Sequence, residues 1–569
     1  MAGAERELMA IGTGLVERGV LKPDQLDRAV AEQRSTGERL DRVLIRMGFA
    51  TRAQILEAVG DQFQMPVVDV TTLAVDASVL ATLPSKLVFR QRCVPIAREN
   101  GVLTVATSDP YEISVLDELR LLTGCAIHLV LADEEELHSF IRANYGVGGD
   151  TLDAMEAGLG GPARIVESKP TDEAEQAQEA SVIRLVNDVL SEAIEQRATD
   201  VHVEPYEHEL TVRYRIDGVL QRANVPASIH RFGSAIVSRL KIMANLNIAE
   251  KRRPQDGRIT FRHRPQTGPV QEFDLRVSVI PMISGEGVVL RVLSKTAVLL
   301  PLNDLGMPQG ILATWGKLIE RPHGILLVTG PTGSGKSTTL YASLNRIVGE
   351  DIKVITIEDP VEYHVGGVNQ IPVNHKVGLD FATGLRSVLR HDPDVVMIGE
   401  IRDKETAETA VQASLTGHLV LSTLHTNDSC GAMTRLLDMG VEPFLVSSSI
   451  EGVLAQRLVR RVCSACAAEH ALDLADVPEG FVAPASGTMM RGVGCKVCRN
   501  TGFRGRVGIY ELLRVTERTR ELVMAKASGP EIAKCALADG QLSRLVEDGF
   551  EKARRGVTTL SEVLSAAAV

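Results

Sequence analysis

Apolar positions recur at helical spacing through the first 65 residues of the 569-residue chain, and part of this pattern occurs twice. Each copy places its apolar residues after a glycine-containing turn, which is typical of short amphipathic helices. The matching positions are Leu15 and Leu44, Gly19 and Gly48, Leu26 and Ile55, Ala29 and Ala58, and Gln33 and Gln62. A unit this short cannot bury its apolar face alone, so we expect two helix pairs that pack on one another.

The pattern changes after Met65. Residues 102–106 alternate as in a strand and residues 115–122 have helical spacing, so we assign residues 1–145 to one domain, a helical repeat at 10–65 followed by an α/β part. Residues 146–180 contain six glycines, no aromatic residue, and eight acidic against two basic residues. A segment so poor in apolar side chains cannot offset its ordering entropy, so we predict a flexible acidic linker there.

A second domain is expected at residues 181–300, beginning with Ser181 as a helix N-cap. The apolar residues that follow lie on one helical face: Val182, Leu185, Val186, Val189, Leu190 and Ile194. Alternating strands come next, and the pair Asp217-Gly218 closes one of them with a turn. Two later strand-like runs carry Arg276 and Arg291. These elements predict a small α/β domain.

The third domain, residues 301–569, contains a phosphate-binding motif between a strand-like run and a helical one. The motif consists of Gly330, Pro331, Thr332, Gly333, Ser334, Gly335, Lys336 and Ser337, and Thr338 follows in the helix. Its glycines let backbone N–H groups turn toward phosphate oxygens, and the helix N-terminus favours negative charge. Lys336 can reach the β- and γ-phosphates of ATP, and Ser337 can ligate Mg²⁺. A chance glycine-rich turn is the weaker alternative.

Three candidate catalytic residues follow strand-like runs in the same domain. Ligands of open α/β sheets lie at the carboxyl ends of strands, so Glu358 and Glu400 could converge on the phosphates. A carboxylate there can polarise the attacking water or hold the water shell of the metal. The catalytic interpretation is favoured for Glu400 and stays open for Glu358 against a strand-end cap. His425 is better placed than His418 to sense phosphate, with a structural histidine as an equal alternative.

Four of the eight cysteines form two C-x-x-C pairs, and the other four are isolated along the chain. The paired residues are Cys463 and Cys466, and Cys495 and Cys498. Four thiolates at this spacing suit a closed, structural Zn²⁺ site. A redox C-x-x-C is the competing interpretation, but it would not need a second pair. The isolated cysteines are expected to be small buried apolar residues in a reducing compartment.

Composition narrows the classes of function. The chain has a net charge of −11, a pI near 5.7, 4% aromatic residues and one tryptophan, which argues against a helicase or DNA translocase with a basic, stacking channel. The intact Lys336, Ser337 and Glu400 argue against a binding or scaffold protein whose nucleotide site has degenerated. No secretory signal or membrane-spanning run is evident. We therefore expect a cytoplasmic ATPase that uses ATP and Mg²⁺ and binds no nucleic acid.

From about residue 181 to about 555, the chain resembles the secretion traffic ATPases of the type II secretion and type IV pilus assembly family. Four boxes match in order: the Walker A loop 330–337, the acidic box 358–362, the Walker B segment ending at residues 399–403, and the histidine box 416–427. As in that family, Gly399 precedes the Walker B glutamate. The resemblance implies an α/β fold with a RecA-like P-loop core, a PAS-like domain in front of it, and a zinc module at 460–505.

The same resemblance implies roles and partners. Arg276 and Arg291 match middle-domain arginines that approach the nucleotide phosphates. The family implies a homo-hexameric ring that drives an inner-membrane platform to extrude pseudopilin or pilin fibres, so attachment to the inner membrane would come through partners. The segment 451–460 looks more like the type II secretion member than the pilus assembly member, which is the alternative.

The N-terminal repeat resembles the paired modules that bind cyclic di-GMP in some relatives. Those modules usually begin each half with Arg-Leu-Gly, whereas this chain has Ala10-Ile11-Gly12 in the first half and Arg39-Leu40-Asp41 in the second. Because both halves depart from the pattern, we expect this domain to dock to a membrane-anchored partner rather than to bind the nucleotide.

Overall fold

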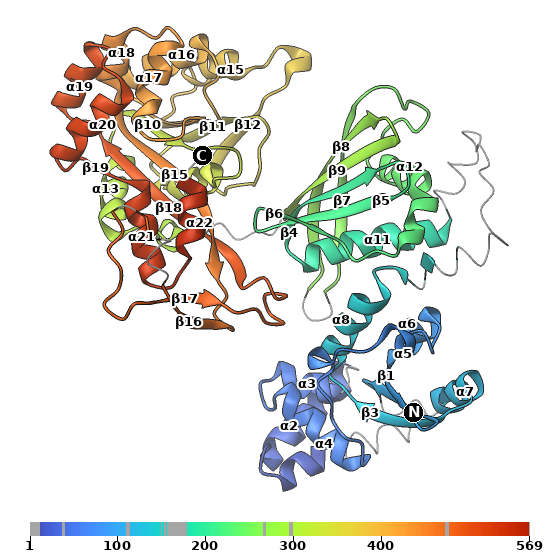
Figure 1. Cartoon of the computed structure of the whole chain (residues 1–569). Helices are drawn as coiled ribbons and strands as arrows, with labels where there is room; N and C mark the ends of the chain where they lie inside the picture. Colours follow the sequence, from blue (N-terminus) through green and yellow to red (C-terminus); the bar gives the residue numbers. More distant parts are fainter. Residues whose placement is uncertain are drawn as a thin grey trace. The chain divides into compact units, whose positions relative to one another are not determined.

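The chain divides into two compact units, Met1–Val292 and Leu293–Val569, in a computed structural model (Figure 1). The described residues are 12–36, 40–109, 114–149, 151–152, 155, 179–265, 269–294, 300–472, 477–478 and 480–567. The first unit contains the predicted N-terminal domain and residues 181–292 of the predicted middle domain, and the second contains residues 293–300 and the predicted ATPase domain.

The N-terminal repeat folds as the apolar spacing predicts. A helix at residues 12–17 precedes α2 (Pro23–Thr36), and α3 (Leu40–Arg46) precedes α4 (Arg52–Gln62). The equivalent glycines Gly19 and Gly48 both have positive φ, +72° and +69°, at the turn of each copy. Repeated apolar positions from both copies, including Leu15, Leu44 and Ala58, share one buried cluster. Of the positions compared with the cyclic di-GMP modules, Ala10, Ile11 and Arg39 lie outside the described residues.

The α/β part of this domain is a three-stranded sheet with helices packed on it. Its strands, in spatial order, are β1 (Cys93–Glu99), β2 (Val102–Thr107) and β3 (Ala126–Leu131). The helices are α5 (Ala77–Leu80), α6 (Ser85–Gln91), α7 (Ser114–Thr123) and α8 (Glu134–Tyr145), with a 3₁₀ turn at Val70–Thr72. The strand and the helix expected at 102–106 and 115–122 are therefore both present.

The chain after α8 packs on the middle domain, where the sequence predicts the start of a linker. The Val147 N–H donates to the Asn224 carbonyl at 2.8 Å, and Val147 and Leu152 belong to the buried core of the middle domain. The predicted linker therefore begins too early, because two buried apolar residues are enough to anchor a glycine-rich segment. Residues 156–178 of the predicted linker lie outside the described residues.

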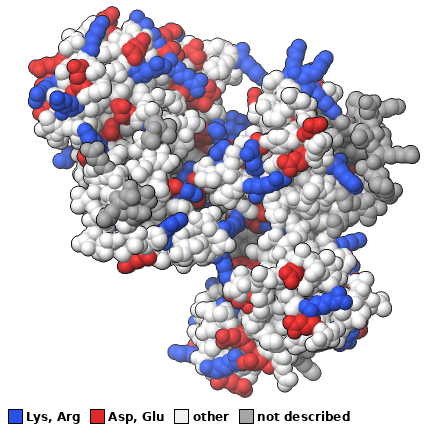
Figure 2. Space-filling model, viewed as in Figure 1, with Lys and Arg blue, Asp and Glu red and all other residues white. Residues whose placement is uncertain are grey.

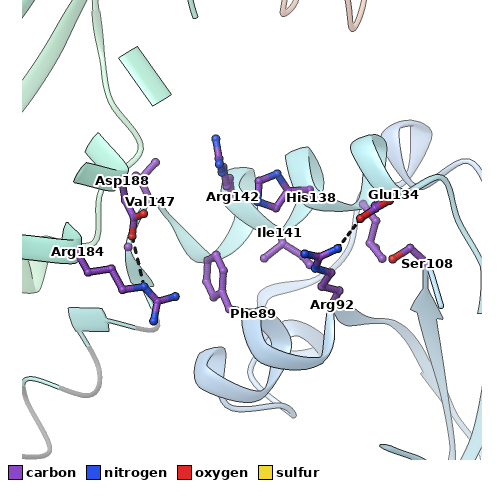
Figure 3. A pocket seen from close by; sticks show the side chains of 12 residues that line it. Phe89, Arg92, Ser108, Glu134, His138, Ile141, Arg142, Val147, Arg184 and Asp188 are labelled. Carbon is purple, nitrogen blue, oxygen red and sulfur yellow. Dashed lines mark hydrogen bonds and ion pairs between the residues drawn. The ribbon is translucent and has the colours of Figure 1, made fainter. Parts of the chain in front are cut away.

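A hollow of about 200 Å³ lies at this junction between α8 and α11 (Ala180–Glu195), as Figure 3 shows. The arginines at its wall have carboxylate partners: Arg92 with Glu134, Arg184 with Asp188, and Arg142 with Glu195. Each of these three arginines therefore has a carboxylate partner, which favours a packed junction over an anion site.

The middle domain is a six-stranded sheet with α11 and α12 (Gly233–Met243) contributing to its core. The spatial strand order is β6 (Val219–Arg222), β5 (Leu210–Ile216), β4 (Ala198–Pro205), β9 (Gly285–Ser294), β8 (Gln271–Met282) and β7 (Gln255–His263). All six residues of the predicted helical face are buried, and Asp217 and Gly218 both have positive φ in the predicted turn. Ser181 is not the N-cap, because the helix already begins at Ala180 and Glu179 precedes it.

The second unit is built on an eight-stranded, mainly parallel sheet. The spatial order is β12 (Val368–Pro372), β11 (Val354–Glu358), β13 (Val395–Ile398), β14 (Leu419–Leu424), β10 (Gly324–Thr329), β15 (Ile450–Val462), β18 (Phe503–Arg514) and β19 (Leu542–Ser543). Strands from β12 to β15 run parallel, and β18 and β19 are antiparallel additions. Successive residues of β10, such as Ile325 and Leu326, belong to different buried clusters, one on each face, so both faces of the sheet are covered.

The helices of this unit are α13 (Gln309–Ile319), α14 (Lys336–Ile347), α15 (Phe381–Val388), α16 (Lys404–Leu415), α17 (Gly431–Asp438), α18 (Pro443–Ser449), α19 (Glu517–Met524), α20 (Gly529–Ala538), α21 (Leu545–Arg554) and α22 (Leu560–Ala567). A hairpin of β16 (Ala467–Ala471) and β17 (Thr488–Gly492) lies between β15 and β18 in the chain. Acidic and basic side chains are interspersed over both units in the view of Figure 2. Within the described part of the chain, every helix is too short or too polar to cross a bilayer.

Candidate nucleotide site and metal centre

The phosphate-binding loop connects the end of β10 to the start of α14, in the strand–loop–helix arrangement that the sequence predicts. Gly330, Gly333 and Gly335 have φ values of +146°, +79° and +91°, a region that residues with a Cβ rarely adopt. Ser337 and Thr338 are exposed in the first turn of the helix, so their hydroxyls are accessible. This geometry fits a cradle for phosphate oxygens with a hydroxyl available to a metal ion.

Lys336 folds back over this loop. Its Nζ donates to the carbonyl oxygens of Gly330 and Pro331 at 2.8 and 3.1 Å. Burial lowers the pKa of Lys336 to about 8, and the nearby Glu400 raises it and Arg457 lowers it by smaller amounts. The Lys336 ammonium therefore lies at the loop and donates to neutral carbonyl oxygens. A negatively charged phosphate would be a stronger acceptor at the same place.

Glu400 follows β13 at the same edge of the sheet. Its carboxylate pairs with the Arg402 guanidinium, and its Oε2 lies 3.2 Å from the His425 Nε2. Burial alone would raise the pKa of Glu400, but hydrogen bonding and charge from Arg402 and His425 outweigh it, so the pKa is lowered. The group is therefore an ionised carboxylate near neutral pH.

The two histidines that bracket β14 differ in their environments. His425, after the carboxyl end of the strand, contacts Glu400. The Nδ1 of His418, at the opposite end, lies 2.9 Å from the Ala413 carbonyl oxygen and 3.1 Å from Thr416 Oγ1. His418 therefore holds the turn after α16, and His425 belongs to the candidate site.

Glu358 ends β11 and is 4% exposed. Its carboxylate accepts hydrogen bonds from the Tyr341 hydroxyl, from Thr356 Oγ1 at 2.5 Å and from Gln370 Nε2 at 3.0 Å. Three protein donors thus occupy this carboxylate, so Glu358 holds the side chains of Tyr341, Thr356 and Gln370 in place.

Arg276 and Arg291 belong to the middle domain, where β8 and β9 bring them to one hollow of about 480 Å³. Arg258, opposite Arg276 in the β7–β8 pairing, lines the same hollow, together with Asp200 and Asp256. The Arg291 Nε lies 3.3 Å from Asp200 Oδ1, and the Arg291 side chain is 54% exposed. Three arginines and two aspartates give the hollow an excess of positive charge.

The four paired cysteines converge beyond the carboxyl end of β15 and before the start of β18. Their sulfur atoms all lie within 4.8 Å of one another, with Cys463–Cys495, Cys466–Cys498 and Cys495–Cys498 separations of 3.8, 3.7 and 3.7 Å. Four Zn–S bonds of about 2.3 Å in a tetrahedron place sulfurs roughly 3.8 Å apart. The N–H groups of Cys495 and Gly502 donate to the Cys498 sulfur at 3.2 and 3.3 Å, which favours a thiolate. The residues fit a closed zinc site.

Sequence reasoning missed several residues that touch these sites. Gln456 and Arg457 on β15 contact the loops after β10 and β14, and Arg258 joins the arginine hollow. The available signal for the first two was a polar pair within the apolar strand 453–459. No spacing rule connects that pair to loops that lie distant in the chain.

Comparisons with known proteins agree with this architecture. The sequence model of the family described as "Type II/IV secretion system protein" matches residues 175–565, and that of the "MshEN domain" matches residues 63–151. The chain is 42% identical to the "Type II secretion system protein E" of Xanthomonas campestris over 97% of both chains. It is also 42% identical to the "Type IV pilus assembly ATPase PilB" of Myxococcus xanthus, over 97% of this chain and 98% of that protein. The solved ATPase DotB of Yersinia pseudotuberculosis is 21% identical over 68% of this chain and 93% of its own, with a TM-score of 0.50, and supports the fold alone.

The chain therefore belongs to the type II/IV secretion system protein family. The resemblance drawn from the four sequence boxes is confirmed, and so is the predicted fold class, α/β with a RecA-like ATPase core, an N-terminal domain and a four-cysteine module. The chain is an ATP-hydrolysing secretion ATPase.

Proposed function

We propose that this ATPase is the motor of a type II secretion system, coupling ATP hydrolysis to pseudopilus assembly and to protein export across the outer membrane. The observation that carries the proposal is the convergence of Lys336, Glu400 and His425 at one sheet edge, in a chain that aligns end to end with a type II secretion protein E.

In this mechanism Lys336 binds the β- and γ-phosphates of ATP, and the backbone N–H groups of residues 330–337 bind the remaining oxygens. Ser337 ligates Mg²⁺, which when bound neutralises charge on the phosphates. Thr338 adds a second hydroxyl at the same helix N-terminus. The positive φ of the three loop glycines supports this role, because it turns successive N–H groups toward a bound anion.

Glu400 orients and polarises the attacking water. Its lowered pKa supports this assignment, since a general base must be ionised at working pH. His425 holds the Glu400 carboxylate through the 3.2 Å contact and senses the γ-phosphate. Glu358 keeps its place in the mechanism as a positioning group, because its three protein donors fix its carboxylate at the start of the acidic box.

Arg276 and Arg291 supply guanidinium groups to the ATP phosphates during turnover. Their shared hollow with an excess of positive charge supports this, because paired donors on a planar guanidinium suit phosphate oxygens. The four cysteines hold a structural Zn²⁺, and the separations of their sulfur atoms support that assignment.

At the level of assembly, the proposal is a homo-hexamer in the cytoplasm, attached peripherally to the inner membrane. The platform of the secretion machine and a membrane-anchored docking protein are its partners, with the N-terminal domain as the docking element. The match of residues 63–151 to the MshEN domain keeps cyclic di-GMP as a candidate ligand to be tested on the full chain.

The test is ATP hydrolysis by the full-length protein with lipid and the platform partner, with and without DNA. We expect turnover that DNA does not stimulate, and Lys336→Ala should abolish productive ATP binding. Stimulation by DNA alone would favour a translocase instead, and absence of hydrolysis in the assembled system would contradict the proposal.

A pilus assembly ATPase is the second candidate, favoured by the 42% identity to the pilus protein of Myxococcus xanthus. Complementation separates the two. The gene should restore export in a strain that lacks its type II secretion ATPase and should fail to restore pili in a strain that lacks its pilus assembly ATPase. The reverse result would transfer the assignment to pilus assembly.

A further inference from the structure

Strand β15 passes beside the phosphate-binding loop, and the side-chain amide of its Gln456 contacts the loop with one end and helix α14 with the other. The Gln456 Nε2 donates to the Ser334 carbonyl oxygen at 2.7 Å, and its Oε1 accepts from Thr339 Oγ1 at 2.7 Å. Gln456 is 1% exposed and Thr339 is 1% exposed. Because Ser334 lies in the loop and Thr339 in the first turn of α14, one buried amide ties the loop to the helix that follows it.

Two motif glycines face the same residue. A Cβ atom on Gly330 would lie 2.6 Å from the Gln456 carbonyl oxygen, and one on Gly335 would lie 2.9 Å from the Gln456 Nε2. Neither distance is tolerated by a real Cβ atom. The glycines therefore serve a close approach to β15 as well as the positive φ of the loop.

The next residue of the strand holds a second loop. The Arg457 Nη2 donates to the Asn427 carbonyl oxygen at 2.9 Å, in the segment that follows His425. Successive side chains of a strand point to opposite faces, so Gln456 and Arg457 reach the two loops from opposite sides of β15. The strand thus fixes the loop after β10 and the loop after β14 with adjacent residues.

We infer that Gln456 is a positioning residue of the ATP site, and the inference rests on the proposed hydrolysis of ATP. Both polar ends of its side chain are occupied by protein, so Gln456 acts through Ser334 and Thr339. Misplacing a binding or catalytic group by about 1 Å costs on the order of a hundredfold in rate, which sets the scale for a loop that loses this anchor.

The first experiment measures the affinity of the full-length protein for a fluorescent ADP analogue, in wild type and in Gln456→Leu. Leucine keeps the bulk of the side chain and removes both hydrogen bonds. We expect affinity to fall about tenfold or more, because the Ser334 carbonyl and the Thr339 hydroxyl lose their buried partner. Zinc content, measured in parallel, should not change.

Val459→Ala is the matched control. Val459 lies on the same strand, is 2% exposed, and packs with Ile509 and Leu545 rather than with the loop. The variant weakens β15 by removing buried methyl groups, so it should lower the melting temperature and leave nucleotide affinity within about twofold. Equal losses of affinity in Val459→Ala and Gln456→Leu would mean that general weakening of the strand explains the effect, and would overturn the inference.

The partner residue gives an independent test if Gln456→Leu does not fold. Thr339→Val removes the hydroxyl with little change in shape and should weaken nucleotide binding, whereas Thr339→Ser keeps the hydroxyl and should restore it. Nucleotide affinity unchanged in both Gln456→Leu and Thr339→Val would overturn the role of Gln456 and leave the proposed function intact. A wild-type protein that binds nucleotide without hydrolysing it would instead contradict the proposed function.

Discussion

The two clusters of charged side chains assigned to ATP turnover are built differently. In the ATPase unit, Lys336 donates to loop carbonyls, and Glu400 is held by Arg402 and His425. In the middle domain, Arg258, Arg276 and Arg291 line an open hollow with only two aspartates. The first cluster has its groups oriented and its pKa values shifted, whereas the second keeps an excess of cationic charge.

The difference indicates a division of labour. A carboxylate held by an arginine and a histidine has a fixed orientation, and its lowered pKa keeps it ionised, as a group that acts on water must be. An excess of arginine in a hollow offers paired donors to an anion that the domain itself does not supply. The first cluster should therefore govern the chemical step, and the second should respond to the charge that develops on the phosphates. The predictions below are ordered by their expected effect on ATP turnover.

Glu400→Gln should have the largest effect. The amide cannot act as a base, so we expect turnover to fall by about 10² to 10⁴, the usual contribution of general-base catalysis, while ATP binding is retained. Steady-state hydrolysis and nucleotide affinity measure the two quantities on the assembled protein. Glu405→Gln is the matched control, because Glu405 pairs with Arg386 on the neighbouring helix and is 65% exposed. Hydrolysis at the wild-type rate in Glu400→Gln would remove the catalytic assignment.

The Arg276→Ala, Arg291→Ala double variant should come next. Loss of donors that stabilise developing charge costs about 10² to 10³ in turnover, and we expect a much smaller change in ATP affinity. Arg262→Ala is the matched control, since Arg262 is on the same sheet, pairs with Glu272 and lies outside the hollow. Normal turnover in the double variant, measured with the platform partner present, would restrict the ATPase site to the second unit.

This contrast also explains which features the sequence predicts. The phosphate-binding loop and the two C-x-x-C pairs were recognisable because each motif is contiguous and its backbone geometry follows from local glycines. The order of strands placed Glu400 and His425 at one edge, because parallel strands in an α/β sheet end together. These predictions needed only local spacing and the topology of a known sheet type.

The remaining features depend on contacts between distant residues. Gln456 and Ser334 are 122 residues apart in the chain, and a buried glutamine in an apolar strand carries no signal of its partner. Arg258 joins the arginine hollow only through the register of β7 against β8. The start of the linker was misplaced at residue 146 because composition averages over a window, whereas Val147 and Leu152 each fill a specific site in the middle-domain core.

The pH dependence of nucleotide binding should be a smaller effect. It distinguishes the two clusters, because Lys336 titrates in this range whereas the arginines of the middle-domain hollow do not. The pKa of Lys336 is about 8 without nucleotide, and a bound phosphate raises it. Below about pH 8 the ammonium is present with and without ligand. Above it, the free protein loses this proton and must regain it on binding, so affinity should fall by up to about tenfold per pH unit.

Calorimetry in two buffers of different ionisation enthalpy checks this. At about pH 8.5, binding of ATP should take up part of a proton, and at about pH 7 uptake from Lys336 should be close to zero. The pKa of Glu400, the carboxylate neighbour of Lys336, is lowered by Arg402 and His425, so this group stays ionised over the range and adds no proton of its own. Absence of proton uptake at the higher pH would show that Lys336 has the same charge with and without ATP, and would contradict a bound phosphate raising its pKa.

Replacing Cys466 by serine should have the smallest effect on turnover although it removes the metal. The cluster is built from two local turns, and between it and the phosphate-binding loop β15 is anchored by the Arg460–Glu562 pair at 2.6 Å. We therefore expect about one Zn²⁺ per chain in the wild type and its loss in Cys466→Ser, with a lower melting temperature and nearly unchanged nucleotide affinity. Cys535→Ser, outside the cluster, is the control and should keep the metal.

Less than about a tenth of an equivalent of zinc in wild-type protein, prepared without chelators, would contradict the site. A large loss of nucleotide affinity on zinc release would instead mean that the cluster and the ATP site are coupled through β15, and the anchoring role of Arg460 would be wrong.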